Sequence, residues 1–224
     1  MAPLAPPLRL FPAFPGGKRL GDVERWAAEF GFPTLLGTDE AGRGPLAGPV
    51  VAAAVCFPVD ISIPGLDDSK KLGPETREAL FPLIRREALA WGAAFSSAGE
   101  IDTINILRAS LDAMARAVLL AEHRGAHAPL IVVDGNQPLP LDRPQETVVG
   151  GDALSLCVAA ASVIAKVLRD RWMEHAALRY PGYGFEVHKG YPTALHRTRL
   201  QELGPCALHR RSFRGVLFER KTDR

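Results

Sequence analysis

The chain has 224 residues, 47% of them hydrophobic and 23% charged, with a formal net charge of +2, a composition typical of a globular protein with a sizeable core. It has no run of the roughly 18 apolar residues that a membrane helix needs, and its start lacks the apolar segment and cleavage site of a signal peptide. Three cysteines without a CxxC pair indicate reduced thiols in a cytoplasmic protein and argue against a disulfide framework or a zinc site.

The first 33 residues are rich in proline, and we expect a poorly packed N-terminal extension at 1–33 with a short helix around 22–30. Residues 35–39 then predict a first strand. The uncharged run at 46–57 is rich in valine and alanine, which predicts a second strand buried on both faces. The sequence GRGPLAGP between them has too many turn residues for regular structure.

Strands and helices alternate along residues 34–180. The pattern predicts, in order, a helix at 74–90, a strand at 91–97, a helix capped by Asp102 or Thr103, strands at 130–133 and 147–149, and a long helix at 153–179 that Asp152 opens. Strands followed by helices indicate a mixed α/β sheet of five strands in this segment.

Residues 181–224 are punctuated by glycine and proline, and they predict a helical segment near 194–203 followed by a basic tail. From Lys189 onward nine basic residues face three acidic ones, a net charge of +6, which leaves −4 for the rest of the chain. A weakly acidic body with a basic C-terminal segment favours a polyanion as the partner. The alternative is a solvated, arginine-rich tail.

Two adjacent carboxylates, Asp39 and Glu40, end the first predicted strand. Carboxylates at the end of a buried strand are costly unless a charge compensates them, and a divalent cation is the usual partner of carboxylate oxygens. Arg43, inside the glycine-rich loop that follows, indicates that a phosphate supplies the cation's other ligand. The alternative is a surface turn in which both acidic residues meet water.

Asp134 and Asp152 follow the strand at 130–133 and precede the long helix. Each has a plain alternative, since Asp134 fits an Asp-Gly-Asn turn and Asp152 fits a helix N-cap. Four carboxylates that converge without His or Cys would select Mg²⁺ or Mn²⁺. Two such ions about 3.5–4 Å apart can activate water and stabilise the leaving oxygen of a phosphodiester.

Ordered motifs from about residue 35 to residue 213 resemble bacterial type 2 ribonuclease H, ribonuclease HII. They are DEAGRGPLAGPV (39–50), DDSKKL (67–72), EIDTINILRAS (100–110), VVDGN (132–136), GDALSLCVAAASVIAKVLRDRWM (151–173), YPGYGFEVHKGYPTALH (180–196) and HRRSF (209–213). The resemblance implies a ribonuclease H-like catalytic domain at 34–180 and a C-terminal helical, basic, substrate-binding extension at 181–224. It also implies cleavage of RNA in RNA–DNA hybrids and at single ribonucleotides in duplex DNA. We expect the chain to act as a monomer.

The same resemblance assigns site residues. It places the catalytic and metal-binding carboxylates on Asp39, Glu40, Asp134 and Asp152. It implies that Gly42, Arg43 and Gly44 contact the ribonucleotide 2′-hydroxyl and that Tyr191 contacts the sugar at the junction. Beside the resemblance, we infer that Lys70 and Lys71 contact phosphates.

Two rival functions remain. Ribonuclease HIII shares the fold but carries an N-terminal substrate-binding domain, for which at most 33 residues are present before the first strand. A non-catalytic hybrid-binding module would be expected to have lost one acidic residue, and all four are present.

Overall fold

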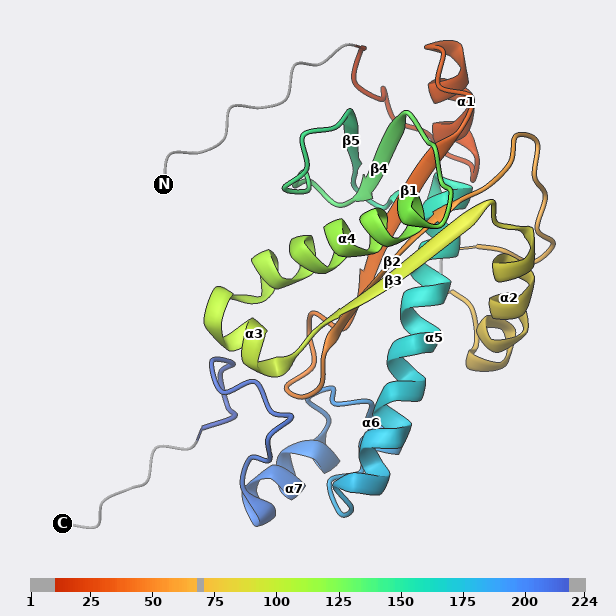
Figure 1. Ribbon diagram of the computed structural model, residues 1–224. Coiled ribbons are helices and arrows are strands. Elements are labelled where there is room, and N and C mark those ends of the chain that lie inside the picture. Colours follow the sequence, from red (N-terminus) through yellow and green to blue (C-terminus); the bar gives the residue numbers. More distant parts are fainter. Residues whose placement is uncertain (1–10, 68–70, 218–224) are drawn as a thin grey trace.

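The computed structural model describes residues 11–67 and 71–217 (Figure 1). The strands are β1 (Leu35–Ala41), β2 (Val50–Cys56), β3 (Ala90–Ser96), β4 (Leu130–Asp134) and β5 (Gln145–Val148). The helices are α1 (Asp22–Glu29), α2 (Pro74–Glu87), α3 (Ala98–Ile104), α4 (Ile106–His123), the 3₁₀ turn η1 (Gly151–Ala153), α5 (Leu156–Arg179), α6 (Phe185–His188) and α7 (Ala194–Leu203). The predicted Lys70 contact lies outside the described residues.

The five strands form one mixed sheet in the order β3-β2-β1-β4-β5. Strand β2 pairs antiparallel with β1 and β3, whereas β1, β4 and β5 run parallel. Every residue of β2 is buried, as its uncharged sequence predicts. The predicted mixed five-stranded α/β fold is confirmed, although β2 begins at Val50 and residues 46–49 stay in the preceding loop.

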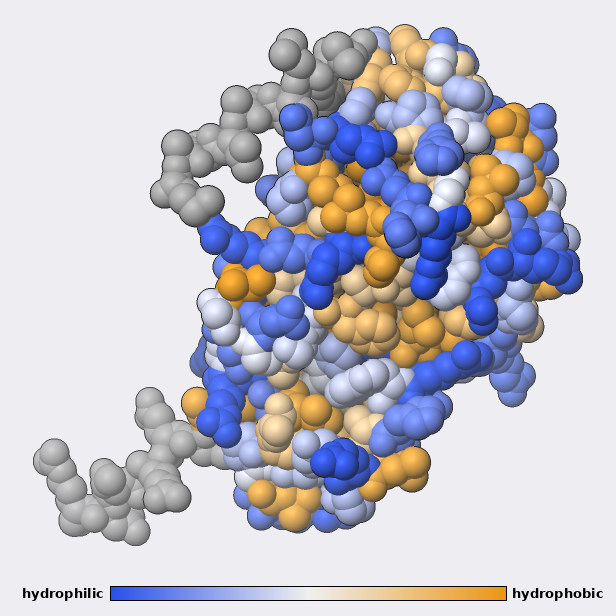
Figure 2. Space-filling model, viewed as in Figure 1, coloured by the Kyte–Doolittle hydropathy of each residue, from blue (hydrophilic) through white to orange (hydrophobic). Residues whose placement is uncertain are grey.

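Helices cover both faces of the sheet, and Figure 1 shows α4 lying across one face with α5 on the other side. Alternating residues divide the core accordingly. Leu35 and Leu130 pack with α5 and α2, whereas Leu36 and Ile131 pack with α4. In the same view, Figure 2 shows apolar surface in the middle of the molecule with hydrophilic residues around it. None of the helices in the described part of the chain is long and apolar enough to cross a membrane.

Part of the N-terminal extension packs against the core, whereas residues 12, 13 and 15–19 are exposed, so the expectation of poor packing does not hold for helix α1. Helix α1 buries Val23, Trp26 and Ala27 against the core cluster that includes α5. Phe11 and Phe14 meet the Trp26 ring edge-on, with centroids 5.7 Å and 5.6 Å away. The apolar residues at helical spacing outweigh the proline-rich composition, because each adds buried area.

Three helix starts differ from the prediction. Ser97 caps α3 in a reciprocal capping box with Glu100, and Asn105 caps α4, so neither Asp102 nor Thr103 is the cap. Asn105 separates the two helices with a φ of +70°. Helix α5 begins later than expected, with the Ser155 side chain accepting a hydrogen bond from the Val158 amide. The N-cap alternative for Asp152 is therefore wrong.

The C-terminal helical segment is joined to the loop between β1 and β2. Leu46 N donates to the Gly190 carbonyl at 2.8 Å, and Gly48 N donates to the Leu208 carbonyl at 2.9 Å. Ala47 pairs with His209 as an isolated antiparallel bridge. These bonds place the segment after residue 180 beside the end of β1, where the acidic residues lie.

Candidate active site

Asp39 and Asp134 lie on adjacent parallel strands. Thr38 of β1 pairs with Val133 of β4, so the next residue on each strand reaches the same edge of the sheet and points to the same face. Only 4% of Asp39 is exposed. Burial, followed by the charges of Asp134, Glu40 and Asp152, raises the pKa of the Asp39 carboxyl well above its usual range. The charges of the other three acidic residues therefore all act on Asp39.

Asp152 reaches this edge because α5 packs closely on β1. Gly37 of β1 makes the approach possible, since a Cβ there would lie 2.4 Å from the Val158 nitrogen. The η1 turn just before α5 holds Asp152, which is 2% exposed. Its neighbour Gly151 donates its backbone N–H to Asp134 Oδ1 at 2.7 Å. The turn thus connects the carboxylates of β4 and of the helix start.

The acidic residues suit a hard divalent cation. The cluster has oxygen donors and no His or Cys, and the repulsion that raises the pKa of Asp39 is what a cation would relieve. Within the described residues, no group of three or more His, Cys, Asp or Glu side chains stands in a position to hold a metal ion. Mg²⁺ does not depend on such a group, because it keeps several waters and is bound through one or two carboxylates together with substrate phosphates.

The loop predicted to read the substrate follows Glu40 directly. Arg43 is exposed, with Nη1 3.4 Å from Glu40 Oε1. Gly42 adopts a φ of +104°, and a Cβ there would lie 2.1 Å from Arg169 Nε. A Cβ on Gly44 would lie 3.8 Å from Cε1 of Tyr191. The structure therefore brings the loop, the predicted tyrosine and the carboxylates together.

Tyr191 presents a partly free ring beside this loop. It is 40% exposed, and the ring centroid lies 5.7 Å from Lys166 Nζ and 5.7 Å from the Arg169 guanidinium carbon. Of the two cations, Lys166 is partly exposed, and beside the aromatic face it forms a surface suited to a sugar and its phosphate.

Two buried arginines brace the loop, and the sequence analysis did not single them out. Arg210 is 0% exposed and donates four hydrogen bonds, to the carbonyl groups of Gly42, Arg43, Pro45 and Gly48. Arg210 is one of the nine basic residues that were counted toward a polyanion partner, and because it is buried it cannot contact one. Burial and the charge of Arg169 lower the pKa of Arg210 to about 9.

Arg169 is the second brace. It is also 0% exposed and donates to the Pro49 and Ala47 carbonyls at 3.0 Å and 3.2 Å. The sequence did contain a signal for its burial, because Arg169 lies on a face of α5 that is otherwise apolar. A charged residue on such a face must find polar partners such as carbonyl groups.

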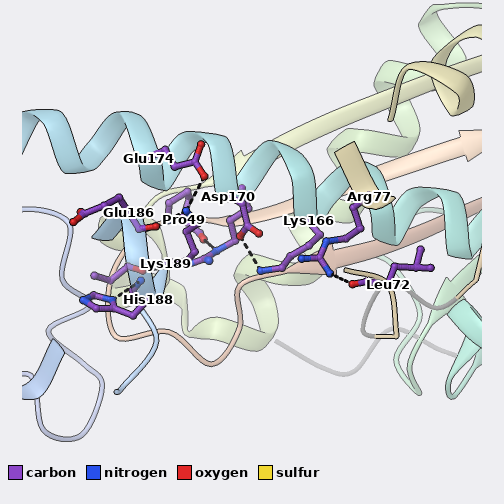
Figure 3. A network of polar contacts seen from close by, with 12 residues as sticks. Pro49, Leu72, Arg77, Lys166, Asp170, Glu174, Glu186, His188 and Lys189 are labelled. Atoms are coloured by element: carbon purple, nitrogen blue, oxygen red, sulfur yellow. Dashed lines mark hydrogen bonds and ion pairs between the residues drawn. The ribbon is translucent and has the colours of Figure 1, made fainter. Parts of the chain in front are cut away.

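The lysines are less closely tied to the site. Lys71 pairs with Asp67 at 3.1 Å on the exposed loop before α2. Figure 3 shows two further pairs along α5, Lys166 with Asp170 at 2.8 Å and Lys189 with Glu174 at 2.7 Å. Of these cations, Lys166 is the one that lies beside the Tyr191 ring.

Two solved structures share this fold. The ribonuclease H2 from Pyrococcus horikoshii OT3 superposes with a TM-score of 0.66 at 26% identity, over 82% of this chain and 95% of that one. Bst ribonuclease HIII in complex with Mn²⁺ shares the fold with a TM-score of 0.63 at 19% identity, over 82% of this chain and 68% of that one. The fold and its acidic edge define a metal-dependent hydrolase of the ribonuclease H class.

The family described as Ribonuclease HII matches residues 36–216. A ribonuclease HII from Syntrophotalea carbinolica is 53% identical over 83% of this chain and 88% of its own length. The chain belongs to the ribonuclease HII family. This membership decides against ribonuclease HIII.

Proposed function

We propose that the chain is an endoribonuclease that cleaves the RNA strand of RNA–DNA hybrids and the 5′ side of single ribonucleotides embedded in duplex DNA. Membership of the ribonuclease HII family supports ribonuclease H activity on hybrids. The observation that carries the finer proposal is that a Cβ on Gly44 would lie 3.8 Å from Cε1 of Tyr191, in the loop that follows the acidic end of β1. It supports a site in which one nucleotide would meet an aromatic ring, a glycine loop and the acidic residues.

The acidic residues would hold the cations. Asp39, Glu40, Asp134 and Asp152 supply carboxylate oxygens, and Gly151 N–H orients Asp134 through its hydrogen bond. The chemistry that two Mg²⁺ or Mn²⁺ ions would supply there is activation of water and stabilisation of the leaving oxygen, which would leave 5′-phosphate and 3′-hydroxyl ends. Burial of Asp39 keeps bulk water away, which strengthens every charge interaction at the edge of the sheet.

The loop would recognise the ribose through its N–H groups. In a trans peptide the C=O of one residue and the N–H of the next point in opposite directions. Arg210 anchors the carbonyls of Gly42 and Arg43, so the N–H groups of Arg43 and Gly44 turn away from the buried arginine. Neither N–H has an acceptor within the described residues. Both are available to the 2′-hydroxyl, the group that separates RNA from DNA.

The setting proposed for this activity is the cytoplasm, with the chain acting as a monomer in ribonucleotide removal during replication and repair. All three cysteines are free thiols, as expected for a reducing compartment. Exposed arginines of the C-terminal segment and the exposed Lys71 would contact the phosphates that flank the cleaved bond; these arginines are Arg197, Arg211 and Arg214.

The test uses a DNA duplex that contains one ribonucleotide, with Mg²⁺ or Mn²⁺. Wild-type protein is expected to cut at the 5′ side of the ribonucleotide, whereas Asp39→Asn and Asp134→Asn lose cleavage by roughly 10²-fold or more. EDTA should abolish turnover and leave binding of the duplex largely intact. Near-normal cleavage by either variant overturns the site assignment, and binding without cleavage by the wild type with both metals identifies a non-catalytic binding module.

A further inference from the structure

Three buried histidines lie together next to Tyr191, outside the acidic site. His188 ends α6, His196 belongs to α7, and His209 lies in the segment that pairs with Ala47. Their exposed fractions are 7%, 0% and 2%. The His188 and His196 rings stack with centroids 4.3 Å apart. A cluster of buried imidazoles needs a hydrogen-bond partner for every ring nitrogen.

The hydrogen bonds fix which nitrogen of each ring carries the proton. The Cys206 backbone N–H donates to His209 Nδ1 at 3.0 Å, so the His209 proton is on Nε2. His209 Nε2 donates to His196 Nε2 at 3.1 Å, which leaves the His196 proton on Nδ1. His196 Nδ1 donates to the Tyr191 carbonyl oxygen at 2.9 Å. The chain of bonds runs in one direction, from the backbone of Cys206 to that of Tyr191.

Both linking rings must be neutral for this arrangement, because a second proton on either one removes an acceptor. Burial lowers the pKa of His196, and burial followed by the charge of His196 lowers that of His209 to about 4. The other titratable or charged groups that act on the two rings are His188 and Arg197 by charge, and Cys206, whose Sγ lies 3.2 Å from His209 Nδ1.

His188 fixes the residue before Tyr191. Gly190 N donates to His188 Nδ1 at 3.1 Å, so His188 Nε2 carries the proton that is donated to the Tyr183 carbonyl at 2.8 Å. The Gly190 carbonyl accepts from Leu46 N at 2.8 Å. The backbone groups of Gly190, before Tyr191, and the carbonyl of Tyr191 itself are therefore all hydrogen-bonded by buried groups. The Tyr191 residue nevertheless stays 40% exposed.

We propose that His209 and His196 are positioning residues that hold the Tyr191 backbone, and so its ring, in place for the ribose at the cleavage site. The inference rests on the proposed function, in which that ring contacts the substrate. The ring meets Lys166 and Arg169, but the residue is 40% exposed, so the backbone that carries the ring also sets its direction. A ring that can swing must be ordered on binding, which weakens the affinity for the substrate.

Two substitutions at His196 separate this role from a general contribution to packing. In His196→Asn the side-chain amide nitrogen takes the place of Nδ1 and keeps the bond to the Tyr191 carbonyl. In His196→Gln the side-chain oxygen takes the place of Nε2 and keeps only the bond from His209. Each variant loses one hydrogen bond of the chain, so the two should lose thermal stability alike.

Activity should differ between them. On a duplex with one ribonucleotide, we expect His196→Gln to lower kcat/KM roughly 10-fold, mostly through KM, and His196→Asn to restore it to within about 3-fold of wild type. In a Tyr191→Ala background, His196→Gln should lower kcat/KM by less than about 2-fold more, because both changes remove one interaction. Equal losses for the two His196 variants, or additive losses with Tyr191→Ala, overturn the inference.

The comparison of His196→Gln, Tyr191→Ala and the double variant also distinguishes failure of this inference from failure of the proposed function. If Tyr191→Ala alone leaves kcat/KM unchanged, the substrate contact of the proposed function is wrong and the inference falls with it. Should the variants not fold, the wild-type protein still gives an answer. Nitrogen NMR at neutral pH is expected to show His209 protonated on Nε2 and His196 protonated on Nδ1, and the opposite tautomer on either ring contradicts the chain of bonds.

Discussion

Gly37 sets the distance between β1 and the start of α5, and replacing it tests how the acidic site is assembled. A Cβ at this position would lie 2.4 Å from the Val158 nitrogen and 2.5 Å from the Cys157 carbonyl carbon. Both are backbone atoms, so no side-chain rotation relieves the contact. Ordinary contact begins at 3.4 Å, so Gly37→Ala must separate strand and helix by about 1.0 Å.

This displacement has two consequences of known size. Inserting a methyl group into a packed core costs about 1–3 kcal/mol, which for a chain of this length lowers Tm by roughly 2–12 °C. The η1 turn moves with α5, so Asp152 shifts relative to Asp39 by a similar distance. A misplacement of ~1 Å in a catalytic arrangement can reduce the rate about 10²-fold. We therefore expect a folded protein with roughly 1% of wild-type kcat/KM.

The assay measures Tm and kcat/KM on a duplex with one ribonucleotide. Gly99→Ala is the matched control, because it adds the same methyl group where the nearest atom, Ser97 Oγ, is 3.9 Å away. Inside α3 the control should leave kcat/KM unchanged and raise stability slightly. If Gly37→Ala lowers Tm but keeps kcat/KM within about 3-fold of the control, the spacing of β1 and α5 does not set the acidic geometry.

Three further outcomes follow from the contacts at and around the site. Burial and the neighbouring carboxylates raise the pKa of Asp39 above its usual 3.8, so the folded state holds that proton to higher pH than the unfolded chain does. In the presence of a chelator, the free energy of unfolding should therefore fall as pH rises above about 4. Asp39→Asn should flatten that fall in a urea-denaturation series while losing cleavage. Arg210→Lys should lower the free energy of unfolding by roughly 2–4 kcal/mol and raise KM, since one ammonium cannot reach four carbonyls; unchanged values for both would contradict the bracing role. Ser97→Ala removes the capping box of α3 and should cost about 1 kcal/mol of stability without changing kcat/KM.

Much of the sheet could be predicted from the sequence because its strands are short apolar runs. The fully buried β2 and the apolar β4 fall close to the predicted residues. The meeting of Asp39 with Asp134 also follows from parallel pairing, in which strand ends share an edge of the sheet. Asp152 required tertiary structure, since the local pattern favoured a helix cap and only the close packing at Gly37 brings it inward.

The bracing arginines could not be predicted from local pattern. Arg210 stands in a basic run, HRRSF, where solvation is the default for any single arginine. What buries it is the pairing of its segment with the loop around Ala47, a contact between residues more than 160 positions apart. The packing of Phe11 and Phe14 against Trp26 could not be predicted either. Proline content limits the backbone conformation but does not indicate which side chains will be buried.

The two buried arginines cost stability but fix the conformation of the loop. Arg169 Nη1 has no hydrogen-bond partner within the described residues, and burial lowers the pKa of both guanidinium groups, so holding these charges inside costs stability. In exchange, they fix the orientation of the loop's peptide groups. Anchored carbonyls turn the intervening N–H groups away from the buried arginine, in the loop that follows the acidic end of β1. Positive charge beneath the loop and negative charge at its start therefore both destabilise the isolated chain, and in the proposed function both would be relieved or used when metal and nucleic acid bind.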